Sequence, residues 1–192
     1  YMESRALKAG LDVQFMNRSM IFAGITQTEE IINESFELYG AKVPVGDYKF
    51  NNLSLYFRGD RTKLIALNGN ASIGGYFNGT RNSYGVSATF KPGYRFSVDM
   101  GVNKNFIELP GNSVSADVYT LKIKYNHSVK MLNKLYFQYN AADEKLVTNF
   151  RMNFIHAPLS DLFLVYSNIS DLKGDEKDNG MIALKFTKLF SL

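Results

Sequence analysis

Apolar and polar residues alternate along most of the chain, and residues 135–158 show the pattern clearly. Leu135, Phe137 and Tyr139 share one phase, and the alternation resumes after residues 141–144. The second half sets the apolar residues Phe150, Met152 and Phe154 against the polar residues Asn149, Arg151 and Asn153. A period of two predicts a β-hairpin with one apolar face and one polar face. If the apolar face points inward, the fold is a soluble β-sandwich; if it points outward, that face must meet lipid.

The same alternation predicts about eleven strands. They lie near residues 6–17, 20–28, 48–58, 63–77, 81–91, 93–104, 115–126, 131–141, 144–156, 160–169 and 180–190. Several contain about ten to fourteen residues, whereas a strand of a soluble protein contains roughly five or six. A tilted strand that spans a membrane needs about nine to eleven residues. Strand length therefore favours the lipid-facing alternative.

Helical periodicity is nearly absent from the sequence. The exception is the segment TEEIINESFELYG at residues 28–40, whose apolar residues do not alternate. It predicts either a short helix or an ordered loop, inside a long loop at residues 29–47.

The connections between the predicted strands alternate between two ends of the sheet. One end carries short turns near residues 17–19, 59–60, 91–93, 127–130 and 157–159. The other end carries the connections at residues 29–47, 78–79, 105–114, 142–143 and 172–180, of which the first, third and last are long. Short turns at one end and long loops at the other are typical of outer-membrane β-barrels, whose short turns are periplasmic. The predicted fold class is therefore all-β, an antiparallel up-and-down transmembrane β-barrel.

The positions of the two chain ends predict that at least one further strand precedes the first residue of the sequence. In a closed barrel with an even number of strands, both termini lie on the same side. Here the first predicted strand begins on the long-loop side. We therefore expect residues 1–192 to form a single β-barrel domain that is the C-terminal portion of a longer protein, with at least one strand before Tyr1.

Composition narrows the possible chemistry. The sequence contains no Cys, which excludes disulfides, thiolate metal sites and a cysteine nucleophile. Aromatic residues make up 14 % of the chain, with no Trp, and favour β-structure. The formal net charge is +4, but Lys and Arg are spread along the strands rather than clustered, so no nucleic-acid partner is predicted. No stretch approaches the apolar length of a membrane helix.

Polar residues on the inward phase of the predicted strands are the candidate site. These lumen-facing residues are Arg95, Asp99, Asn103, Lys122, Lys124, Gln138, Asn149, Arg151 and Asn153. Arg95 and Asp99 lie four residues apart on one predicted strand, which permits a gate or a sugar-binding rung. A polar ladder that merely fills the barrel interior fits the same pattern, because charges on a hydrated face can pair with one another at modest cost.

No catalytic residue, metal site or cofactor is predicted. His127 and His156 fall at separate predicted turns without a carboxylate at ligand spacing. Asp175, Glu176 and Asp178 lack the spacing of a calcium loop. A glycosidase needs two carboxylates about 5–10 Å apart, and nothing in the sequence pairs Glu108 with Asp117 or with the 175–178 group. Whether the whole protein is an enzyme stays open, with this segment expected not to be catalytic.

Several motifs resemble those of a bacterial envelope family. They are PheGlnTyrAsn (137–140), AsnPheArgMetAsnPheIle (149–155), SerAspLeuPheLeuValTyr (160–166) and AlaLeuLysPheThrLysLeuPhe (183–190), with ValProValGlyAspTyr (43–48), GlyGlyTyrPheAsnGlyThrArg (74–81) and GluLeuProGly (108–111) upstream. In order and spacing they are similar to domain of unknown function 5916, common in Bacteroidota, over roughly residues 40–192. The resemblance implies an outer-membrane β-barrel that follows a domain similar to family-nine carbohydrate-binding modules.

The expected function is a transport conduit, or a surface anchor for a carbohydrate-binding or carbohydrate-processing protein, in the bacterial outer membrane. The expected partners are outer-membrane lipid and, through an upstream domain, a glycan. Two alternatives stay open. One is a soluble, lipocalin-like barrel or sandwich that binds a ligand, and the other is part of a carbohydrate-active hydrolase.

Overall fold

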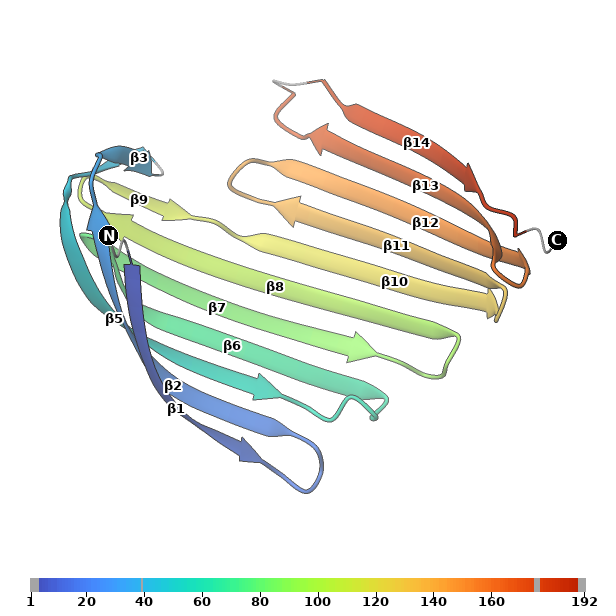
Figure 1. Ribbon diagram of the computed structural model, residues 1–192, viewed down its shortest axis with the longest axis horizontal. Coiled ribbons are helices and arrows are strands. Elements are labelled where there is room, and N and C mark those ends of the chain that lie inside the picture. The colour runs from blue at the N-terminus through green and yellow to red at the C-terminus, as the bar shows by residue number, and fades with distance from the viewer. Residues whose placement is uncertain (1–3, 39, 175–176, 190–192) are drawn as a thin grey trace. The chain divides into compact units, whose positions relative to one another are not determined.

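The computed structural model describes residues 4–38, 40–174 and 177–189, and these residues form an all-β structure (Figure 1). Its strands are β1 (Ser4–Gln14), β2 (Met20–Ile32), β3 (Phe36–Leu38), β4 (Ala41–Val43), β5 (Gly46–Arg58), β6 (Ile65–Tyr76), β7 (Gly79–Phe90), β8 (Phe96–Leu109), β9 (Asn112–Ser115), β10 (Val118–Ser128), β11 (Met131–Asn140), β12 (Lys145–Ala157), β13 (Ser160–Asp171) and β14 (Asn179–Phe186). The described residues include no helix long and apolar enough to cross a membrane.

The main sheet has 12 strands in the order β1-β2-β5-β6-β7-β8-β10-β11-β12-β13-β14, with β9 paired to β8 (Figure 1). Each strand on this path is hydrogen-bonded to the strand before it in the chain once the short strands β3, β4 and β9 are set aside, so the sheet is antiparallel and up-and-down. The strands on the path match the predicted strands one for one. The predicted fold class is confirmed in this respect.

The hairpin at residues 135–158 places its apolar residues on one face, as the alternation predicts. Leu135 pairs with Phe150 and Tyr139 pairs with Leu146, so the apolar phases of β11 and β12 lie on the same face. Lys134 pairs with Arg151 on the opposite face. Because side chains alternate between faces with a period of two, this register fixes which residues share a face along both strands.

The short helix predicted within residues 28–40 is absent, and the described part of that segment is extended. β2 continues to Ile32, and each of its residues from Met20 onward pairs with a residue of β5. Phe36–Leu38 then forms β3, which pairs with β4. A short helix is marginal on its own, whereas the strand pairs its backbone with β5, which explains why the apolar spacing was misleading.

The chain divides into two compact units. The first contains the residues up to Asp60 together with Leu67–Ser87 and Asn103–Asp117, and the second contains Arg61–Ala66, Ala88–Val102 and the residues from Val118 onward. Strands β6, β7 and β8 contribute a stretch to each unit. The expectation of a single domain stays a prediction, and each unit is described by itself below.

Few apolar side chains are buried in the described part of the chain. The buried hydrophobic residues are Ala41, Val43, Ala66, Ile107 and Leu109. Large apolar side chains are instead exposed along the strands of both units, for example Leu11 at 77 % and Leu184 at 68 %. Soluble monomers rarely expose contiguous apolar surface on this scale.

Candidate functional site

An exposed apolar surface follows β1, β2 and β5 in the first unit. The register aligns side chains of the three strands in rows, and these rows are Val13–Ile21–Phe57, Leu11–Ala23–Leu55 and Ala9–Ile25–Leu53. Each large side chain in them is exposed. Successive rows lie about 7 Å apart along the strands. The apolar residues therefore form a continuous band rather than scattered surface positions.

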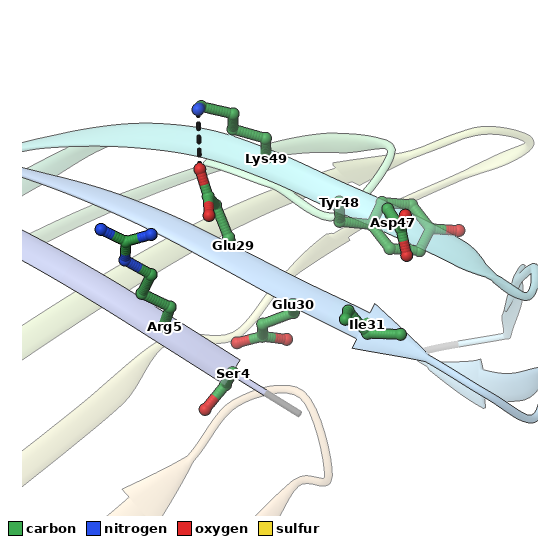
Figure 2. A pocket seen from close by; sticks show the side chains of 8 residues that line it. All are labelled: Ser4, Arg5, Glu29, Glu30, Ile31, Asp47, Tyr48 and Lys49. Carbon is green, nitrogen blue, oxygen red and sulfur yellow. Dashed lines mark ion pairs between the residues drawn. The ribbon is translucent and has the colours of Figure 1, made fainter. Parts of the chain in front are cut away.

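The band ends at a row of charged residues on the long-loop side. The register places Arg5, Glu29 and Lys49 side by side, two rows beyond Ile25. Lys49 Nζ lies 2.7 Å from Glu29 Oε1, and Figure 2 shows this ion pair beside the Arg5 guanidinium. A pocket here is lined by Ser4, Arg5, Glu29, Glu30, Ile31, Asp47, Tyr48 and Lys49 (Figure 2). The apolar band thus has a polar boundary, as a membrane-spanning surface requires.

One face of the second unit is polar. It carries six of the residues predicted to face a lumen, which are Lys122, Lys124, Gln138, Asn149, Arg151 and Asn153. The register adds two residues that the sequence analysis did not single out, Lys134 and Tyr136. Both share the phase of Gln138 on β11, so the alternation alone was sufficient to find them. The structure therefore assembles these residues into adjacent rows.

Arg95 and Asp99 contact different residues. Arg95 precedes β8, its guanidinium carbon lies 5.3 Å from the centre of the Tyr94 ring, and its Nε donates a 3.0 Å hydrogen bond to Tyr94 Oη. Asp99 Oδ1 accepts a 2.6 Å hydrogen bond from Thr89 Oγ1. None of these contacts joins Arg95 to Asp99, and the gate or sugar-binding rung stays a prediction.

Asn103 lies on β8 within the first unit, beside Gly85. A Cβ atom at Gly85 would collide with the side-chain oxygens of Asn70 and Asn103. Nearby, Ser83 Oγ donates a 2.8 Å hydrogen bond to Asn105 Oδ1. The glycine therefore leaves room for a cluster of amide side chains on the polar face.

The connection between β2 and β5 folds onto the polar face of the first unit. Ala41 of β4 packs with Ile107 and Leu109 of β8, and Leu38 and Tyr76 pack against this cluster. Ile107 and Leu109 have the same phase as Asn105, so the β3–β4 hairpin lies on the polar side of β8. This hairpin is the part of the long loop that the sequence left undefined.

Aromatic rings hold the hairpin in place. The Phe77 ring contacts those of Phe36, Tyr48, Phe50 and Tyr76, with ring centres 4.9–6.1 Å apart. Tyr48 Oη donates a 2.7 Å hydrogen bond to the carbonyl oxygen of Pro44. The hairpin is thus anchored at β3, at β4 and at its exit into β5.

The two histidines considered for metal binding lie on different strands. His127 and His156 belong to β10 and β12 rather than to turns, and they contact different rings, Tyr125 and Phe186. No group of three or more potential metal ligands occurs within residues 4–38, 40–174 and 177–189. Asp175 and Glu176 lie outside the described residues, so the calcium alternative at this loop is not tested.

Asp117 forms an ion pair rather than a catalytic pair. Its Oδ2 lies 3.1 Å from Lys104 Nζ, and its Oδ1 accepts a 3.0 Å hydrogen bond from Ser115. The hydrogen bond with Lys104 lowers the pKa of Asp117, with a smaller contribution from Ser115 and against an opposing effect of desolvation. This carboxylate stabilises the connection that carries β9.

Comparisons with known proteins add little. No protein-family model matches the chain, and no curated protein matches it. One solved structure, a KdgM porin in complex with disordered oligogalacturonate, is similar over 87 % of this chain and 91 % of its own, with 7 % identity and a TM-score of 0.40. That TM-score is below the level that indicates a shared fold. The resemblance to domain of unknown function 5916 stays a prediction.

Proposed function

We propose that this chain forms part of an outer-membrane β-barrel, with the apolar face against lipid and the polar face lining a conduit for solutes. The observation that carries the proposal is the exposed apolar band of β1, β2 and β5. In water this band would cost free energy roughly in proportion to its area, whereas lipid removes the cost.

Strand length and connections support the same proposal. β2 and β5 contain 13 residues each and β8 contains 14. These lengths meet the requirement of about nine to eleven residues for a tilted membrane-spanning strand. The three longest connections, β2–β5, β8–β10 and β13–β14, join the strand ends that lie opposite the β1–β2 turn. A soluble sandwich would need a second layer over the apolar band, and the described side chains of that band are exposed instead.

The test uses the full-length protein in its native membrane and after reconstitution. We expect it to fractionate with the outer membrane, to need detergent for extraction and to migrate faster on a gel when unheated. Reconstituted into a planar bilayer, it should give discrete conductance steps.

Each outcome separates the alternatives. Extraction in buffer without detergent would contradict the membrane proposal and favour a soluble binding protein. Membrane insertion without conductance would contradict the conduit and favour a surface anchor for a glycan-handling domain. Hydrolysis of a glycan that survives removal of residues 1–192 would place any enzymatic activity outside this segment.

A further inference from the structure

We propose that the polar face of the second unit binds small solutes carrying two or more negative charges, through a row of cations on three adjacent strands. Lys124 of β10 pairs with Lys134 of β11, and Lys134 pairs with Arg151 of β12. Directly opposed residues have Cβ atoms about 4.5–5.5 Å apart. Their register therefore brings three positive charges together on one face.

A fourth cation lies next to this row. Lys122 precedes Lys124 by two residues and therefore occupies the same face, about 7 Å along β10. Its cross-strand neighbours Tyr136 and Asn149 are hydrogen-bonding residues. Tyr136 Oη donates a 2.7 Å hydrogen bond to Gln138 Oε1. The row is thus bordered by groups that can donate or accept hydrogen bonds to a polar solute.

The three cations of the row form no ion pair with the part of the chain that the structure describes. Ion pairs elsewhere include Lys49 with Glu29, Lys104 with Asp117 and Lys173 with Glu144. The side chains of Lys124, Lys134 and Arg151 are all exposed. The guanidinium carbon of Arg151 lies 5.0 Å from the centre of the Phe163 ring, which orients the charge without cancelling it.

Among the residues that the structure describes, three carboxylates on the strands of this unit share this face, and none lies opposite the row. Asp161 faces Ile155, two rows from Arg151, and Asp171 faces Lys145, three rows away in the other direction. Two hydrogen bonds indicate the register of β8 and β10. Asn126 N donates to the carbonyl oxygen of Arg95, and Thr120 Oγ1 donates to the carbonyl oxygen of Gly101. That register places Asp99 opposite Lys122 and places Ser97, not an acid, opposite Lys124.

A like-charged row destabilises a sheet unless something compensates for it. Like charges directly opposite one another are unfavourable in antiparallel pairs, and a ladder that only fills a lumen would pair Lys with Asp or Glu. Three cations spaced about 4.8 Å apart across the strands match a solute with several carboxylate or phosphate oxygens. This inference deepens the proposed function, because the solutes that the conduit selects would be anionic.

Citrate is a suitable probe, and calorimetric titration of the full-length protein in neutral detergent at low salt measures its binding without requiring conductance. We expect wild-type protein to bind citrate, and Lys134→Gln to weaken binding about tenfold or more, the effect of removing one charged hydrogen-bonding partner. Lys63→Gln makes the same charge change in the β5–β6 turn and should bind as wild type does. Arg151→Lys should bind more tightly than Arg151→Gln, because it keeps the charge but loses the planar fork.

The two proposals fail in different ways. Equal citrate affinity in wild type and Lys134→Gln, with both proteins heat-modifiable on a gel, would overturn the anion site, as would wild-type protein that binds no citrate. Citrate binding that follows the expected order in a protein without conductance would uphold the site and reject only the conduit.

Discussion

At the scale of single residues, the key question is which environment each face of the sheet meets. Leu55 and Ser54 are neighbours on β5 whose side chains point to opposite faces. Leu55 is 45 % exposed and belongs to the apolar band. The same substitution at these two positions therefore reports on the two environments separately.

Replacing Leu55 by Lys should destabilise the protein in lipid vesicles by about 2–4 kcal/mol if this row lies near the bilayer midplane. Ser54→Lys places the same charge on the polar face and should change stability by less than about 1 kcal/mol. Urea unfolding of both variants in vesicles measures the difference. In a soluble protein an exposed Leu55→Lys substitution would be nearly neutral, so a small effect at both positions would contradict the lipid-facing assignment.

A second residue-scale prediction concerns Asp117. Its pKa is lowered in the folded protein by Lys104, so the ion pair stabilises the fold above the pKa of the unfolded state. That contribution is lost as the pH falls through the lower, folded pKa.

The midpoint of urea unfolding should accordingly be lower for Asp117→Asn than for wild type at about pH 7, and the difference should shrink as the pH falls through the lowered pKa of Asp117. Asp47→Asn, which removes a carboxylate of β5, serves as the control for a general loss of negative charge. A difference between wild type and Asp117→Asn that persists unchanged in acid would show that the Asn side chain disturbs the loop for another reason.

At the scale of elements, the long regular strands were predictable and the short ones were not. The strands β10, β11 and β12 alternate over most of their length, and their faces follow from it. β3 and β4 contain three residues each, too few to display a period. Their position depends on contacts with Ile107 and Leu109, which lie more than sixty residues further along the chain. Such contacts leave no local signal in the sequence.

The candidate site was predictable to the same extent. Lys122, Lys124 and Arg151 were assigned to the polar face from the alternation. Their alignment with Lys134 could not be predicted from the alternation, because it depends on the register set by the turns. Arg95 was assigned to a strand because its phase matches Asp99, whereas β8 begins one residue later, at Phe96.

The β3–β4 hairpin offers a test at this scale. Ile107→Ala removes a side chain that is 2 % exposed beneath the hairpin, at a cost of about 2 kcal/mol or more. We expect trypsin to cleave after Lys42 about tenfold faster or more, since cleavage follows the population of the opened hairpin. Phe106→Ala, on the other face of β8, is the matched control. Equal cleavage rates in both variants would show that the cluster does not hold the hairpin.

At the scale of the whole molecule, each unit combines an exposed apolar face with a polar face, and the sheet connects its long strands in chain order. The proposed anion row belongs to the polar face of the second unit, and the proposed contact with lipid belongs to the apolar band of the first unit. The two kinds of function are separable by substitution because neighbouring residues on a strand serve different faces.

The charged row of Arg5, Glu29 and Lys49 has a mechanical consequence for such a protein. Polar groups at this position resist entry into hydrocarbon. In a bilayer the row would therefore limit how deeply the strands that carry it can insert. The vertical position of the protein would then be set by its own side chains rather than by the length of the surrounding lipid tails. A bilayer of different thickness would have to deform around the row, which makes the local lipid shape a property encoded by the sequence.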